Sequence, residues 1–123
     1  MNDLQALFDT LKPLLQAYAP PLTPQVDTPT RYELWSVKPL VIEGRKRKEV
    51  FFASLIIQKS YVGFYFMPVY VETELKGIFQ PELLRLLKGK SCFHIKKLDA
   101  ALLGQVEAAL KTGFELYQQR GWV

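Results

Sequence analysis

The 123-residue sequence predicts an α+β fold in one domain, with a mainly antiparallel β-sheet. Two runs rich in β-branched and aromatic residues, 49–57 and 61–71, flank the polar segment 58–60, which is the pattern of a tight hairpin. Apolar residues also recur at helical spacing near both ends of the chain, over 4–18 and 102–117. We therefore expect an N-terminal helix, a short helix before the last strand, and a long C-terminal helix packed on the sheet.

The N-terminal part of the chain divides into a helix over residues 1–18 and a connector over 19–30. Pro13 lies inside the helical pattern, and the apolar phase continues beyond it, so we expect one kinked helix. The connector contains four prolines, which predicts an extended segment without regular secondary structure. The sheet and the remaining helices should then occupy residues 31–123.

Alternating residues predict a strand over 31–37, which Pro39 interrupts. Residues 43–48 read as a polar turn before the large hairpin. Further along, Pro81 suits the first turn of a short helix that Gly89 would end. A last strand over 91–97 leads to Asp99, which can cap the C-terminal helix.

The large hairpin is apolar on both of its faces. In its first run, strict alternation places Phe51, Ala53, Leu55 and Ile57 on one face and Phe52 on the other. In its second run, Val62, Phe64 and Phe66 oppose Tyr61, Tyr65 and Met67. A sheet that is apolar on both faces must be covered on both. The C-terminal helix can cover one face, and the other should meet a second copy of the chain, a ligand or another protein.

Composition excludes several classes of protein. No window approaches the ~20 apolar residues of a membrane span, and the N-terminus lacks the basic region of a signal peptide, so we expect a cytoplasmic protein. The single cysteine, Cys92, excludes an intrachain disulfide. The net charge of +4 is a mild excess, and with no recognisable reading motif it does not favour nucleic-acid binding.

No complete catalytic motif is present, so we expect a non-enzymatic protein without a cofactor. Gly89-Lys90-Ser91 resembles the end of a phosphate loop, but the motif needs a glycine where this chain has Leu84, and it needs a strand before the loop and a helix after it. Cys92 and His94 share one strand face and are weak candidates for metal ligands. A structural zinc site needs four ligands, and a Cys-His nucleophile pair needs contact closer than the ~6.6 Å spacing along a strand.

Two groups of residues are candidates for binding. A groove or interface could be formed by six aromatic or adjoining residues of the predicted sheet: Tyr32, Trp35, Tyr61, Tyr65, Met67 and His94. An anion patch could be formed by the densest charge run, Arg45, Lys46, Arg47 and Lys48. Basic turns of this kind are more often solvated hairpin tips that discourage pairing between sheet edges.

Several segments together resemble the YdhG-like family, a set of small bacterial domains of unknown function. The matching segments are WSVKP at 35–39, Gly44, FFAS at 51–54, KSYVGFY at 59–65 and KGKSCFHI at 88–95. The resemblance extends over about residues 32–122 and implies an α+β domain with an antiparallel sheet and a packed C-terminal helix. Some relatives are described as frataxin-like iron chaperones, and iron of that kind prefers clustered carboxylates. Glu72 and Glu74 are the only close acidic pair near an element end, so we assign no iron-site residues.

The sequence thus predicts an interaction module that forms a homodimer through an apolar, aromatic sheet face. The alternative is a protein that binds a small ligand or a metal ion in the manner of an iron chaperone. A flat surface would favour the dimer, whereas a concave pocket with convergent polar groups would favour the ligand.

Overall fold

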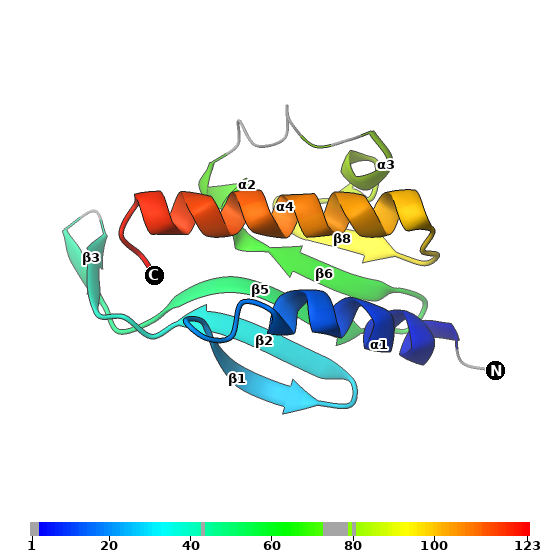
Figure 1. The fold of residues 1–123 in the computed structure, drawn as a ribbon, viewed down its shortest axis with the longest axis horizontal. Helices are drawn as coiled ribbons and strands as arrows, with labels where there is room; N and C mark the ends of the chain where they lie inside the picture. The colour runs from blue at the N-terminus through cyan, green and yellow to red at the C-terminus, as the bar shows by residue number, and fades with distance from the viewer. Residues whose placement is uncertain (1–2, 43, 73–78, 80) are drawn as a thin grey trace.

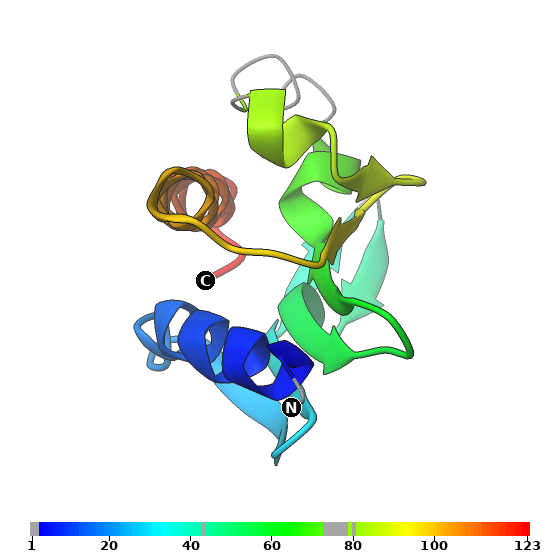
Figure 2. The same cartoon turned by 90° about the vertical axis from the view of Figure 1, so that its right-hand side faces the viewer.

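The computed structural model describes residues 3–42, 44–72, 79 and 81–123. Figure 1 shows a twisted sheet crossed by two helices, α1 (Asp3–Gln16) and α4 (Ala100–Gln119). Figure 2 shows that both helices lie on the same side of that sheet. This arrangement confirms the α+β prediction, including the antiparallel sheet and the long C-terminal helix.

The main sheet has six strands in the order β1-β2-β5-β6-β8-β7, and every neighbouring pair is antiparallel. Its strands are β1 (Thr23–Thr28), β2 (Arg31–Ser36), β5 (Val50–Ile57), β6 (Val62–Phe66), β7 (Leu87–Lys88) and β8 (Cys92–Ile95). Strands β3 (Leu40–Ile42) and β4 (Arg45–Arg47) form a separate hairpin beside it. The described residues also include two short helices, α2 (Met67–Val71) and α3 (Pro81–Leu84).

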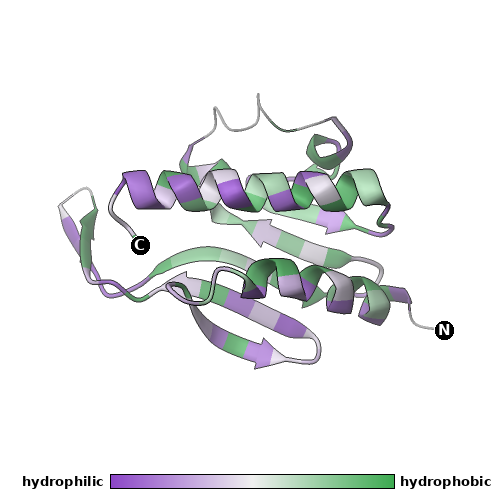
Figure 3. Cartoon of the chain, viewed as in Figure 1, coloured by the Kyte–Doolittle hydropathy of each residue, from purple (hydrophilic) through white to green (hydrophobic). Residues whose placement is uncertain are grey.

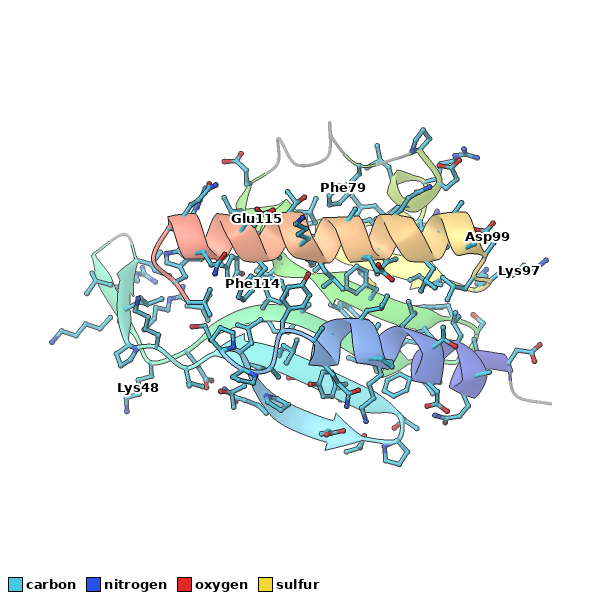
Figure 4. The ribbon with its side chains drawn as sticks, in the orientation of Figure 1. Lys48, Phe79, Lys97, Asp99, Phe114 and Glu115 are labelled. Atoms are coloured by element: carbon cyan, nitrogen blue, oxygen red, sulfur yellow. The ribbon has the colours of Figure 1, made fainter. Side chains whose placement is uncertain are left out.

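The core lies between the sheet and helices α1 and α4. Phe52 is fully buried, and its ring packs edge-on against Phe66, Phe114 and Tyr117 at centroid distances of 5.2–6.3 Å. Figure 4 shows Phe114 pointing from α4 toward α1, where its ring meets Tyr18 at 5.0 Å. Figure 3 shows alternating hydrophobic and hydrophilic bands along α4, which the helical spacing predicts.

Two predictions about local structure are confirmed at the C-terminal helix and at the hairpin. Asp99 caps α4, accepting a hydrogen bond from the Leu102 amide at 2.7 Å. Strands β5 and β6 pair as predicted, with Leu55 opposite Phe64. No helix of the described ranges is both long and apolar enough to cross a membrane.

The connector prediction for 19–30 was wrong, because residues 23–28 form strand β1. This strand is an edge strand that pairs only with β2, so Pro24 does not interrupt a second ladder. The register shifts between Pro24 and Val26, where an irregularity accommodates the proline. Helix α1 runs through Pro13 as one element.

Three other element boundaries differ from the prediction. Residues 45–47 form strand β4 rather than part of a turn, and Gly44 supplies the turn with a φ of +79°. Helix α3 ends at Leu84, and Gly89, with a φ of +76°, lies instead in the turn between β7 and β8. Strand β6 ends at Phe66, because Pro68 suits the start of α2 and cannot donate to a sheet ladder.

The predicted face assignment of β5 was also wrong at its start. Trp35 pairs with Phe51 and Leu34 pairs with Ala53, so Phe52 is an extra residue in β5. Such a bulge lets two successive residues face the same side. Phe52 therefore joins Ala53 and Leu55 in the core, while Phe51 lies with Trp35, its ring 5.2 Å from the indole.

Candidate functional site

The side of the main sheet that faces away from α1 and α4 is the first candidate surface, here called the open face. It is formed by residues of β2, β5, β6 and β8 and by Tyr61, which directly precedes β6: Glu33, Trp35, Phe51, Ser54, Ile56, Tyr61, Tyr65, Cys92 and His94. Within the described part of the chain, no helix covers this side (Figure 2). Because the core takes the intervening residues, the open face receives every second side chain of β2, β6 and β8, whereas the bulge at Phe52 shifts this alternation in β5.

Tyr65 lies flat on the open face because its neighbour Gly63 has no side chain. A Cβ at position 63 would lie 2.7 Å from Cε2 of Tyr65, so the ring occupies the space that another residue would fill. The side-chain amide of Gln58 donates to the Tyr65 hydroxyl at 3.0 Å. Burial raises the pKa of Tyr65, and this hydrogen bond opposes the shift. Tyr65 is therefore held in one position as a neutral, flat side chain.

Tyr61 and His94 form a second aromatic contact on the same side. Their rings stack at a centroid distance of 3.8 Å and an interplanar angle of 13°. His94 is opposite Gly63 in the strand register, so this stack borders the position that Tyr65 covers. The predicted candidates Tyr61, Tyr65 and His94 thus lie together in one half-buried cluster.

The buried polar side-chain atoms of the open face are paired within the chain. Glu33, only 8% exposed, accepts hydrogen bonds from Arg31 Nε at 2.6 Å and from Trp35 Nε1 at 3.1 Å. Among the described residues, no buried side-chain nitrogen or oxygen lacks a hydrogen-bond partner. A surface whose polar groups are already satisfied can be covered without the large penalty of an unpaired buried group.

Cys92 and His94 share the open face, as the sequence predicts, but their surroundings do not favour a metal. Within the described residues, no group of three or more His, Cys, Asp or Glu side chains is placed to hold a metal ion. Burial raises the pKa of the Cys92 thiol, and a hydrogen bond with Tyr65 partly offsets this. Reactive and metal-binding cysteines need the thiolate, so a raised pKa disfavours both roles.

The second candidate surface is a hollow between the β3–β4 hairpin, α2 and the C-terminus, here called the hairpin groove. It has a volume of about 420 Å³ and is lined mainly by large apolar side chains: Trp35, Ile42, Arg47, Glu49, Val50, Phe51, Met67, Tyr70, Val71 and Trp122. A neighbouring hollow of about 840 Å³ shares five of these residues and adds Val41 and Arg120. The groove therefore opens beside the hairpin; among the described residues, it is lined by one basic side chain, Arg47, and the neighbouring hollow adds Arg120.

The walls of the hairpin groove are fixed by contacts with the core. Trp122 packs edge-on against Tyr117 at 5.0 Å, and its carbonyl oxygen accepts a hydrogen bond from the Ser36 hydroxyl. Tyr117 in turn donates to the Phe51 carbonyl oxygen at 2.6 Å, and burial raises its pKa strongly. Arg120 lies over the Trp122 ring at 5.2 Å and pairs with Glu72 at 3.3 Å.

The six predicted groove or interface residues divide between different places. Tyr61, Tyr65 and His94 form the cluster on the open face, Met67 lines the hairpin groove, and Trp35 belongs to both surfaces. Tyr32 is 1% exposed and lies in the core, with Lys12 over its ring at 5.4 Å, so it contributes to neither surface.

The predicted anion patch also divides. Arg45, Lys46, Arg47 and Lys48 are all exposed, yet only Arg47 lines the groove. Figure 4 shows Lys48 pointing away from the two long helices. The groove itself was missed from the sequence because its walls come from segments as distant as Trp35 and Trp122.

In comparisons with known proteins, no family model matches the chain, and no curated sequence or solved structure does so either. The resemblance to the YdhG-like family stays a prediction from the sequence.

Proposed function

We propose that this chain is a non-enzymatic interaction module that forms a homodimer through the open face. One observation carries the proposal: α1 and α4 both cover one side of the sheet, while the other side presents the flat cluster of Tyr61, Tyr65 and His94. These three side chains line neither the hairpin groove nor the hollow beside it. A flat aromatic surface suits a protein partner better than a small ligand.

The area of the open face is enough for a small interface. Its four strands contain six, eight, five and four residues, which at about 3.3 Å per residue and about 4.8 Å between strands give roughly 360 Å² of sheet per copy. Two such faces would cover about 700 Å² in total, which is the size of a weak, transient interface. A two-fold axis through the face would bring the same residues of each copy together, which is the usual arrangement of homodimers.

The surroundings of Cys92 support the non-enzymatic part of the proposal. Its hydrogen-bond partner is the Tyr65 hydroxyl rather than a base, and burial raises the pKa of its thiol. Activated cysteine nucleophiles have a lowered pKa and an adjacent base. The His94 ring is stacked on Tyr61, which leaves it as a packing group on the same surface.

The test is the mass of the particle in solution, measured by light scattering and native mass spectrometry. Wild-type protein should be a dimer at micromolar concentration, and Tyr65→Glu should be a folded monomer, because it places a charge near the centre of the face. Ala108→Glu adds the same charge on the exposed side of α4 and should remain a dimer. A monomeric wild type, or a Tyr65→Glu protein that remains dimeric, would contradict the proposal.

A second variant distinguishes loss of the dimer interface from a folding defect. Ile56 is half-buried on the open face and lies opposite Gly63 and Arg31 in the register. Ile56→Lys leaves the hydrogen bond between Tyr65 and Gln58 in place, and it should also give a monomer with an unchanged circular dichroism spectrum.

A further inference from the structure

Both tryptophans of the chain line the hairpin groove. Trp35 comes from β2 and Trp122 from the segment after α4, and no other tryptophan is present. Phe51 and Tyr70 add two more rings to the same walls. Tyr70 is 49% exposed, one of the most exposed large apolar side chains of the described residues. Flat, rigid rings around an open hollow of about 420 Å³ suit a planar apolar molecule, since small-ligand sites commonly measure ~300–1,000 Å³.

The charges around the groove favour an anion. Among the described residues, Glu49 is the carboxylate that lines the groove, and it accepts a hydrogen bond from Gln25 at 2.6 Å. Arg120 of the neighbouring hollow pairs with Glu72. Arg47 forms no ion pair with any carboxylate of the described ranges. The Lys90 ammonium lies over the Tyr70 ring at 5.5 Å, which adds a second cation near the groove. A guanidinium presents paired donors that match a carboxylate, phosphate or sulfonate group.

We infer that the hairpin groove binds a small molecule with a planar apolar body and one anionic group. The body would lie among Trp35, Trp122 and Tyr70, and the anionic group would meet the guanidinium of Arg47. Trp35 and Phe51 belong to the open face and also line the groove, but Tyr61, Tyr65 and His94, on which the proposed dimer rests, do not line it. Variants of Tyr65 and of Arg47 therefore test the two proposals separately. It also explains why one cation of the basic run is placed against aromatic walls.

The two tryptophans give a direct measurement of binding. Anilinonaphthalene sulfonate has a planar apolar body and one anionic group, and N-phenylnaphthylamine has the same body without the charge. We expect the sulfonate to bind with one probe per chain and to quench tryptophan emission by energy transfer. The neutral probe should bind about tenfold more weakly, because it lacks the charge-assisted contact with Arg47.

Two charge variants of strand β4 locate the anion. Arg47→Gln should weaken the sulfonate about tenfold and leave the neutral probe unchanged. Lys46→Gln removes the same charge from the next residue, whose side chain faces the other side of the hairpin, and it should leave both affinities within about twofold of wild type. Both positions are exposed, so both variants should unfold at the wild-type temperature.

Three results would overturn the inference. The first is equal affinity for the two probes, and the second is equal weakening by Arg47→Gln and Lys46→Gln. The third is loss of sulfonate binding in Tyr65→Glu with full binding in Arg47→Gln, which would place the probe on the open face. A failed dimer test combined with intact Arg47-dependent binding would contradict only the proposed function.

Discussion

The two sides of one sheet show how the same strands build a core and a surface. On the side covered by α1 and α4, Val62, Phe64 and Phe66 of strand β6 are completely buried. On the open face, the alternate position Tyr65 and its neighbour Tyr61 remain half-buried in the single chain. Both sides carry aromatic side chains, so hydrophobic composition alone does not separate them. The difference is that the helices supply partners to one side only.

The two sides also differ in how their polar atoms are satisfied. The covered side has few polar groups, and the buried Tyr117 hydroxyl bonds to a backbone carbonyl at 2.6 Å. The open face pairs polar side chains with one another, as in Arg31–Glu33–Trp35 and Gln58–Tyr65. A surface with internal polar pairs is stable when exposed and can still be covered by a partner. This contrast leads to three predictions, in addition to the dimer and groove tests.

The largest expected effect comes from truncating one ring on each side. Phe52→Ala removes contacts with four rings in the core and should lower the free energy of unfolding by about 3–5 kcal/mol. Tyr61→Ala removes only the stack on His94 at the surface and should cost about 1 kcal/mol. Guanidinium-induced unfolding measures both. Equal losses of unfolding free energy would mean that Phe52 and Tyr61 are packed to the same extent. That result would contradict the division of the sheet into a core side and a surface side.

An intermediate effect comes from two glycines of α4 that face opposite environments. A Cβ at Gly113 would lie 2.4 Å from Cζ of Phe66 and 2.8 Å from Cγ of Pro68. Gly113→Ala should therefore lower stability by about 1–2 kcal/mol, because overpacking outweighs the helix propensity of alanine. At Gly104 a Cβ meets nothing within 4 Å, so Gly104→Ala should raise stability by about 0.5–1 kcal/mol. Thermal unfolding gives the sign of the stability change in each variant. Two shifts of the unfolding temperature in the same direction would contradict the difference in packing around Gly113 and Gly104.

The elements that were predicted correctly have strong local signals. Helix α4 has a periodic apolar pattern over residues 102–117 and a capping aspartate, and both are properties of its own sequence. Strand β1 was missed because its prolines argue against a strand, while its pairing with β2 depends on the edge position in the sheet. The bulge at Phe52 was missed for a similar reason, because the register of β5 is set by its partner strand.

The candidate surfaces were predictable to different degrees. The alternation of side chains along β6 and β8 is enough to place Tyr61, Tyr65 and His94 on one side of the sheet, and the structure brings them together there. The alternation along β2 could not show that Tyr32 lies toward the helices, because the sequence does not say which side of the sheet the helices cover. The hairpin groove joins segments far apart in the chain, so no local pattern indicates it.

The smallest expected effect concerns the chemical reactivity of the Cys92 thiol, which lies on the open face. Burial raises the pKa of Cys92, whereas the hydrogen bond with the Tyr65 hydroxyl lowers it. Alkylation by iodoacetamide requires the thiolate, so native protein should react more slowly than unfolded chain at the same pH. Tyr65→Phe removes the opposing hydrogen bond and should move the alkylation profile to higher pH, while Tyr61→Phe should leave it unchanged. A shift of the Tyr65→Phe profile to lower pH would mean that Tyr65 shields the thiol rather than stabilising the thiolate.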